Sequence, residues 1–160
     1  MQYPAGLSQL WAMAQIDIQK IHFHYIDVRF SFENRTKLKF FLLERLRKEG
    51  FVADAINYIF CTDAYLLEMN QAYLQHDTYT DIITFALSAK GEPLVSDIYI
   101  SVERVQENAA IFKTTFKQEL HRVIFHGLLH LIGYGDKNKA QAGQMRVKEN
   151  EYLKLYFRST

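Results

Sequence analysis

Short runs of β-branched and aromatic residues mark four segments of the chain as predicted strands. Two of these, residues 80–87 and 94–101, flank the turn-forming sequence KGEP and are expected to pair as a hairpin. In that hairpin Asp81 and Asp97 would lie near opposite ends. The other two predicted strands are residues 21–30 and 55–61.

Helical spacing of apolar residues fills the segments between these strands and most of the last sixty residues. Asn34 is a candidate N-cap for a helix that ends at Gly50. Thr62 or Asp63 is a candidate cap for a short helix that runs through Tyr73. Three further helices are predicted at residues 102–112, 117–132 and 139–157.

The order of these elements, strands and helices first and helices alone last, predicts an α+β fold. We expect a small mixed β-sheet of about four strands with about five α-helices packed on it. No repeat or proline-rich linker interrupts the pattern, so residues 1–160 are predicted to form a single domain. Residues 1–15 precede the first strand-like pattern and are expected to form a weakly ordered extension.

Composition narrows the class of protein. Hydrophobic residues make up 49% of the 160 residues and charged residues 23%, a balance typical of a globular domain with a buried core. Cys61 is the only cysteine, so the chain cannot form an internal disulfide. This composition favours a protein of the reducing cytoplasm, and we expect no disulfide-linked partner. The N-terminus lacks the pattern of a secretory signal, and no run of ~20 apolar residues predicts a membrane span.

Charge is distributed unevenly along the chain. The formal net charge is only +1, which argues against a wholly basic nucleic-acid binder. Residues 1–112 hold ten Lys and Arg against fourteen Asp and Glu, whereas residues 113–160 hold nine against four. The basic excess could attract a polyanion, and it is equally consistent with a solvated helix surface.

The sequence HGLLHLIGYGD (126–136) carries the clearest candidate chemistry. His126 and His130 are one helical turn apart, so both imidazoles can face one metal ion. Gly133 is suited to end the helix in a left-handed conformation, after which the chain can return with Asp136 as a third ligand. Two histidines and one carboxylate leave coordination positions open, as catalytic zinc requires.

The same spacing resembles the zinc-protease pattern H-E-x-x-H-x-x-G-x-x-H, with one important difference. Position 127 is Gly, whereas a peptidase of that kind has its Glu general base there. The pattern therefore favours a metal hydrolase and disfavours a peptidase. The alternative is that both histidines are core residues whose ring nitrogens bond to backbone carbonyls.

Three segments of the chain resemble three sequence motifs of the YbeY family and occur in the same order. Members of this family are bacterial metal-dependent endoribonucleases of ribosomal RNA maturation. HGLLHLIGYGD resembles the family's H-G-x-L-H-L-x-G-Y-D-H signature. MNQAYLQHDTYTDIITF (69–85) resembles L-N-x-x-Y-R-x-K-D-x-P-T-D-V-L-S-F, and SDIYIS (96–101) resembles G-D-I-x-I-S. The similarity extends from about residue 57 to the C-terminus.

The resemblance implies one zinc ion (Zn²⁺), a fold of helices around a small mixed sheet, and processing of the 3′ end of small-subunit rRNA. It therefore implies the ribosomal small subunit as a partner. It assigns two metal-binding histidines to His126 and His130, and the family's third histidine falls on Asp136. A carboxylate is an acceptable zinc ligand, but its negative charge weakens the Lewis acidity of the ion and could admit Mn²⁺ or Fe²⁺.

A second difference from the family concerns phosphate binding. The family's arginine in the Y-R-x-K-D segment is Leu74 here, and its lysine is His76. Leucine cannot bind a phosphate, so we consider His76, Arg122 and Lys137 as replacement substrate-binding residues. Ordinary surface solvation explains each of the three equally well.

Other polar residues allow two interpretations. Asp81 and Asp97 could orient the metal-binding histidines from outside the ligand set, or they could be turn and strand-edge residues. His22 and His24 alternate onto one strand face, which a half-exposed strand explains better than a metal site.

The leading hypothesis is a single-domain, metal-dependent single-strand endoribonuclease whose general base the sequence does not identify. One rival is a non-catalytic ribosome-assembly factor that retains the metal and binds rRNA. Another is a non-haem iron oxygenase, whose iron is also held by two histidines and one carboxylate.

Overall fold

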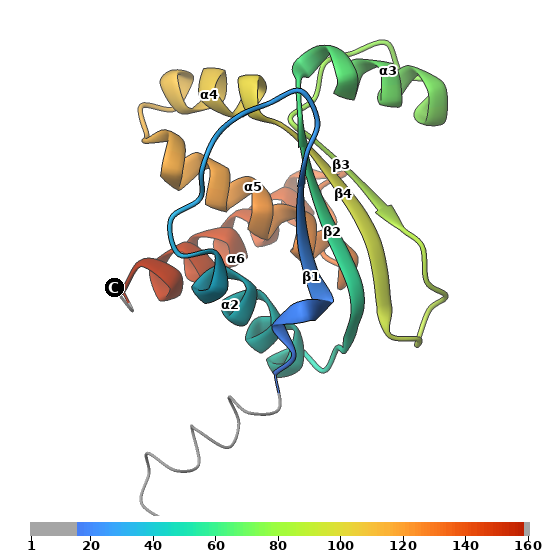
Figure 1. Ribbon diagram of the computed structural model, residues 1–160, viewed down its shortest axis with the longest axis vertical. Coiled ribbons are helices and arrows are strands. Elements are labelled where there is room, and N and C mark those ends of the chain that lie inside the picture. Colours follow the sequence, from blue (N-terminus) through green and yellow to red (C-terminus); the bar gives the residue numbers. More distant parts are fainter. Residues whose placement is uncertain (1–15, 159–160) are drawn as a thin grey trace, which may run out of the picture.

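The computed structural model describes residues 16–158 and is shown in Figure 1. Within these residues, four strands form one sheet and five α-helices surround it, as the predicted α+β fold requires. The predicted weakly ordered extension, residues 1–15, lies outside the described residues. The elements are η1 (Ile18–Lys20, a 3₁₀ helix), β1 (Ile21–Tyr25), α2 (Arg35–Lys48), β2 (Ala53–Cys61), α3 (Asp63–Leu74), β3 (Ile82–Ala86), β4 (Leu94–Ser101), α4 (Val102–Ile111), α5 (Phe116–Leu131) and α6 (Lys139–Arg158).

The sheet is mixed and has the order β1-β2-β4-β3. Strands β1, β2 and β4 are parallel, and β3 pairs antiparallel with β4 at one edge. The predicted hairpin is therefore confirmed. Asp97 lies opposite Phe85, while the Asp81 carbonyl accepts a hydrogen bond from the Ser101 amide at the other end of the pair.

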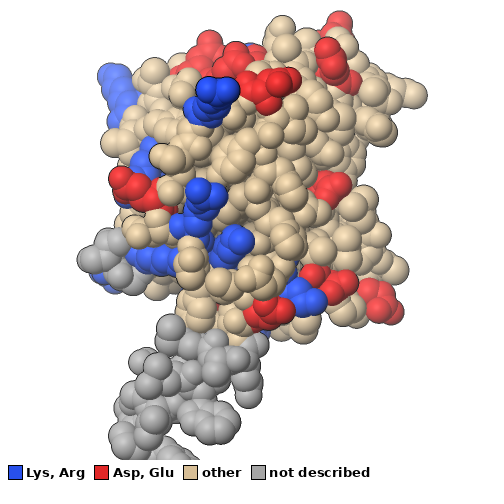
Figure 2. Space-filling model, viewed as in Figure 1, with Lys and Arg blue, Asp and Glu red and all other residues tan. Residues whose placement is uncertain are grey.

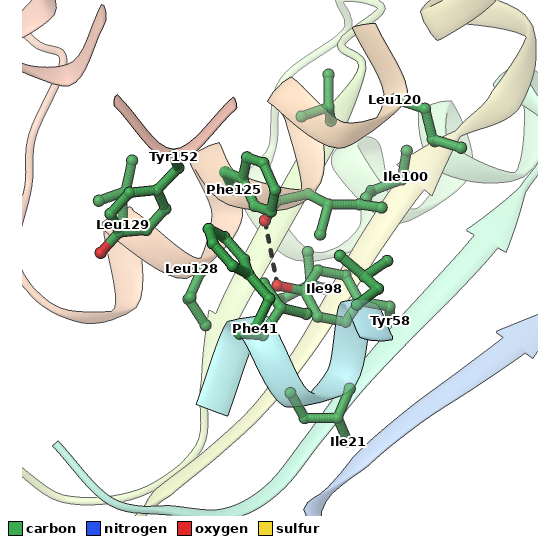
Figure 3. Close-up of a cluster of buried hydrophobic side chains, with 14 of the residues drawn as sticks. Ile21, Phe41, Tyr58, Ile98, Ile100, Leu120, Phe125, Leu128, Leu129 and Tyr152 are labelled. Carbon is green, nitrogen blue, oxygen red and sulfur yellow. Dashed lines mark hydrogen bonds between the residues drawn. The ribbon is translucent and has the colours of Figure 1, made fainter. Parts of the chain in front are cut away.

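Helices α2, α5 and α6 cover one face of the sheet, and α3 lies at one end of the other face (Figure 1). The core between α5 and the sheet includes Tyr58 of β2, which is fully buried. Its hydroxyl donates to the Ile124 carbonyl of α5 at 3.1 Å, so its one polar group is satisfied inside the core (Figure 3). None of the described helices is long and apolar enough to cross a membrane.

The first predicted strand was too long. It ends at Tyr25 rather than residue 30, because Asp27 adopts a left-handed backbone conformation with φ +54° that breaks the extended chain. The apolar residues that follow still pack inward. Phe30 and Phe32 lie with their ring centroids 5.1 and 5.0 Å from that of Phe60. Phe30 and Phe32 therefore belong to a loop that folds over the core, and they are hydrophobic because they pack there.

Helix starts were predicted with mixed success. Thr62 caps α3 as expected, its hydroxyl accepting from the Tyr65 amide at 3.1 Å. Asn34 does precede α2, but it has a left-handed conformation and its side chain makes no capping hydrogen bond. Gly50 follows the end of α2 with φ +84°, a conformation that glycine adopts without steric cost.

His121 of α5 is an ionisable residue inside the helical layer, with an exposed fraction of 3%. Its Nδ1 lies 2.6 Å from the Lys117 carbonyl oxygen, and its ring stacks on Tyr156 with centroids 4.9 Å apart. Nε2 is buried without a hydrogen-bond partner among the described residues. Burial lowers the pKa of this imidazole to about 4, so the ring is neutral in the native protein near pH 7.

This pKa predicts how stability depends on pH. The unfolded chain binds a proton at His121 near the ordinary value of 6.5, whereas the folded protein binds it only near pH 4. The free energy of unfolding should therefore fall as the pH drops from 6.5 to 4, by up to about 3 kcal/mol from this residue. His121→Phe should remove that component. Urea unfolding of both proteins at pH 7, 5 and 4 measures it, and identical pH dependence in the two would contradict the prediction.

Candidate metal centre

His126 and His130 lie in the last two turns of α5 on one helix face. The helix begins at the N-cap Thr115, whose hydroxyl accepts from the Gln118 amide, and its buried stripe faces the sheet. At this spacing the two imidazole centroids are 4.5 Å apart and their planes are nearly perpendicular at 85°. The predicted pairing of the two side chains is therefore present.

The chain returns to these histidines directly after α5. Gly133 has φ +102°, and its amide donates to the His130 carbonyl at 3.1 Å, which ends the helix as expected. Asp136 follows three residues later. Its Oδ2 lies 3.2 Å from His130 Nε2 and 3.5 Å from His126 Nε2.

These three donor atoms have the composition and spacing of a metal site. One ligand atom from each residue lies within 4.8 Å of the other two. Tetrahedral zinc with bonds of 2.0–2.2 Å separates its ligand atoms by roughly 3.4 Å, close to both measured nitrogen–oxygen distances. Two neutral imidazoles and one carboxylate would leave an open position on the ion. The residues present therefore fit a catalytic divalent ion.

A fourth residue, Glu149 of α6, contacts this group and was not identified from the sequence. Its Oε1 lies 2.7 Å from His126 Nδ1, the ring nitrogen that faces away from Asp136. The residue is 5% exposed and lies in the buried stripe of α6, which is formed by Met145, Glu149, Tyr152, Leu153 and Tyr156. A carboxylate within an apolar helical stripe was the available sequence signal.

Electrostatics within this pair favour the charged forms. Burial alone would raise the pKa of the Glu149 carboxyl, but the hydrogen bond and charge of His126, with Arg146 and Arg122, lower it. Burial likewise opposes protonation of His126, and the hydrogen bond and charge of Glu149 outweigh it and raise the pKa of the ring. Glu149 is therefore an ionised acceptor.

Arg122, a candidate phosphate-binding residue, is engaged inside the protein. Its Nη1 lies 3.1 Å from Glu149 Oε2 and 2.8 Å from Asn150 Oδ1. Its Nε lies 3.7 Å from the buried Glu119 carboxylate. These contacts favour a role in holding Glu149 over contact with a phosphate.

The other two candidates lie at the surface. His76 is exposed and follows α3, where its amide donates to the Asn70 carbonyl at 3.3 Å. Lys137 is exposed directly after Asp136, and its amide donates to Gln141 Oε1 at 3.1 Å. Of the two, Lys137 is next to a candidate ligand in the chain, and His76 lines a groove described below.

The structure separates Asp81 from Asp97. Asp81 lies near His126: burial raises the pKa of its carboxyl, while the charge of His126 and a hydrogen bond from Asn108 at 3.4 Å act in the opposite direction. Asp97 alternates with the buried Ile98, so its side chain is on the sheet face opposite α5. There it accepts from Asn57 Nδ2 at 2.9 Å, away from the histidines.

A groove of about 590 Å³ begins at His130 and runs over β3 and the segment after α3. Its walls are hydroxyl, amide, imidazole and aliphatic groups, with neither Lys nor Arg among the described residues that line it. Leu74, at the position of the family arginine, lines this groove together with His130. Other lining residues include Asn70, His76, Thr80 and Ile82.

The face of the molecule drawn in Figure 2 has an uneven distribution of basic side chains. Most of the Lys and Arg visible in Figure 2 lie over the helical half of that face, whereas the part over β3 and β4 carries few charged side chains.

Comparison with known proteins gives consistent matches. The family model described as endoribonuclease YbeY matches residues 18–156. A protein named endoribonuclease YbeY from Cytophaga hutchinsonii is 44% identical over 137 residues, which is 86% of this chain and 96% of that protein. One of the same name from Flavobacterium psychrophilum is 48% identical over 136 residues, covering 85% and 96% respectively. The solution structure of TM1509 from Thermotoga maritima superposes with a TM-score of 0.60 at 29% identity, covering 87% of this chain and 90% of that one.

Gly127 sets how closely α5 approaches the sheet. A Cβ atom built there would lie 2.9 Å from Ile82 Cδ1 and 3.0 Å from Ile98 Cγ2. Position 127 therefore points into the sheet rather than toward the open side of the metal ligands. Its place in the sequence, where a protease has its Glu, serves close packing in this fold.

Substitution by alanine tests this packing. Gly143→Ala on α6 has no neighbour within 4 Å of the new Cβ and should stabilise the protein by up to about 1 kcal/mol through helix propensity. Gly127→Ala should be less stable than Gly143→Ala by about 1–3 kcal/mol, because the methyl group overpacks the interface. Chemical denaturation of both variants measures the difference. Equal stabilisation by the two would show that α5 has room to move.

Proposed function

The chain belongs to the YbeY family of endoribonucleases, and from this premise we propose that it is a metal-dependent enzyme that cuts single-stranded RNA. Its target in this proposal is ribosomal RNA in maturation, at the 3′ end of the small-subunit RNA, and the chain acts as the single domain predicted for residues 1–160. The observation that carries the proposal is the convergence of His126, His130 and Asp136 at one end of a groove.

In this proposal the two Nε2 atoms and the Asp136 carboxylate hold one divalent ion, with zinc as the first candidate. Such an ion supplies a Lewis acid for a phosphodiester oxygen and lowers the pKa of a bound water. The donor set of two nitrogens and one oxygen is also acceptable to Mn²⁺ and Fe²⁺, so the metal must be measured.

The residues of the chain position the RNA around this centre. Because His130 belongs both to the ligand group and to the groove, a scissile phosphate at the ligands would place a neighbouring nucleotide in the groove. The groove offers the hydroxyl groups of Thr78 and Thr80 and the imidazole of His76 beside aliphatic walls, which suits a ribose and a splayed base. Lys137, which is exposed and follows Asp136 in the chain, is the candidate cation for the phosphate backbone.

Removal of a metal-binding histidine should abolish the reaction. His126→Ala is expected to lower the RNA cleavage rate by at least about a hundredfold, as is removal of the metal by a chelator. His24→Ala is a matched control, because this histidine is exposed on β1 and lies on the sheet face opposite α5. Cleavage of single-stranded RNA by the purified proteins, with elemental analysis of each, measures both effects.

The alternatives predict different results in the same experiment. A ribosome-assembly factor without catalytic activity would bind RNA in the presence of chelator and cleave none. An iron oxygenase would contain iron rather than zinc. Cleavage that survives both His126→Ala and chelation would contradict the proposed reaction.

Leu74 offers a gain-of-function test. Leu74→Arg would place a guanidinium in a groove that has no Lys or Arg among its described lining residues. The KM for RNA should fall roughly tenfold, since a charge-assisted hydrogen bond contributes about 1.5–3 kcal/mol. The slope of the logarithm of the binding constant against the logarithm of salt concentration should also become steeper, by about 0.7 for each phosphate contacted.

Leu155→Arg provides the control for net charge. It makes the same substitution at a partly exposed leucine of α6 that is not among the groove residues. An equal effect of both substitutions on KM would show that the charge acts at long range and that the groove does not contact the phosphate.

A further inference from the structure

Glu149 is the only described carboxylate with a hydrogen bond to His126 Nδ1, and it comes from a different helix, 23 residues along the chain. We propose that Glu149 is a positioning residue that fixes the tautomer and orientation of His126 and so makes the site competent to bind its metal. This inference rests on the proposed function, because it concerns the same metal ligands.

Both oxygens of Glu149 have defined partners. Oε1 faces His126 at 2.7 Å, and Oε2 lies 3.1 Å from Arg122 and 3.3 Å from Arg146. Arg122 is itself held by Asn150 and approached by Glu119. Two guanidinium groups therefore compensate the charge of this buried carboxylate and restrict its rotation.

Because two guanidinium groups lie against Oε2, Glu149 is held as a carboxylate that accepts at Oε1, and Nδ1 of His126 is then the donor. The neutral ring then has its lone pair on Nε2, the nitrogen that lies 3.5 Å from Asp136 Oδ2. This is the tautomer that a metal ion requires at Nε2. Without Glu149, the ring could rotate about its side-chain torsions and exchange tautomers.

The position of Glu149 on α6 links metal binding to the packing of that helix. His126 and His130 come from α5, and Asp136 comes from the loop between the two helices. Because α6 supplies the partner of His126, this ligand is aligned only when α6 is packed against α5. Motifs in residues 126–136 therefore contain the ligands but not the residue that aligns the first of them.

Two substitutions of Glu149 separate its functions. Glu149→Gln retains an oxygen that accepts from Nδ1–H but loses the charge, whereas Glu149→Ala loses both. The dissociation constant for zinc, measured by competition with a chromophoric chelator, should rise about 10- to 100-fold in Glu149→Ala and by a smaller factor in Glu149→Gln. Glu151→Ala is the matched control, since this residue is exposed on the same helix and pairs only with Lys148 among the described residues.

A spectroscopic measurement on the metal-free proteins tests the cause. Ring ¹⁵N–¹H correlation spectra, at a pH where His126 is neutral, should show the Nδ1–H tautomer in the wild type and in Glu151→Ala. Glu149→Ala should show an increased share of Nε2–H. Thermal unfolding of each metal-free variant identifies any that fail to fold, and Glu149→Gln serves if Glu149→Ala is among them.

The outcomes distinguish this inference from the proposed function. Zinc affinity within about twofold of the wild type in both Glu149 variants, with an unchanged tautomer, would overturn the positioning role while the metal site stands. A wild-type protein that binds no zinc would overturn the metal site instead, and the tautomer of His126 would then decide the role of Glu149 by itself.

Discussion

Helix α5 lies directly on β3 and β4, and the absence of a side chain at Gly127 is what allows this close contact. The approach has two consequences for the rest of the molecule. It seals the core between α5 and the central strands, where Tyr58 reaches across to bond with the Ile124 carbonyl. It also brings the C-terminal end of α5, with His130, against the edge strand that forms the floor of the groove. A larger residue at position 127 would move the histidines away from that strand.

The orientation of His126, a candidate metal ligand, depends on a second interaction, the buried ion pairs around Glu149. Burying an ionised carboxylate is costly unless it is fully paired, and here one histidine and two arginines surround it. The pairs join α5 to α6 at the point where the apolar packing between them is interrupted. A role of this network in orienting His126 toward a metal ion would explain why its energetic cost is tolerated. An apolar residue at position 149 would leave Nδ1 of His126 without this hydrogen-bond partner.

The groove beside the ligands has an unusual character for a nuclease, since its described lining residues include neither Lys nor Arg. Leu74 lies where the family segment that this chain resembles has an arginine, and Arg122 is turned toward Glu149. In the proposed function, recognition in the groove would therefore use hydroxyl and imidazole groups and aliphatic contact with the ribose and an unpaired base. Binding of phosphates would then fall to exposed cations outside the groove, such as Lys137.

Local patterns in the sequence were sufficient to predict several elements of this fold and the spacing of two candidate ligands. The strand 94–101, the hairpin, the spacing of His126 and His130, and the left-handed helix end at Gly133 all depend on interactions between residues near one another in the chain, which periodicity and turn chemistry report directly. The C-terminal limit of the first strand could not be predicted from the local pattern. Phe30 and Phe32 are hydrophobic because they contact Phe60, which lies on a strand distant in the sequence.

Only the tertiary structure decided the surroundings of the ligands. Arg122 and Lys137 are both basic residues near the motif, but packing of α6 turns one inward and leaves the other exposed. Asp81 and Asp97 likewise belong to one hairpin, and the alternation of β4 places Asp97 on the face away from α5. Glu149 is separated from His126 by 23 residues, so their hydrogen bond exists only once two helices have packed. The identity of the candidate ligands is a local property of the chain, whereas their orientation is a property of the fold.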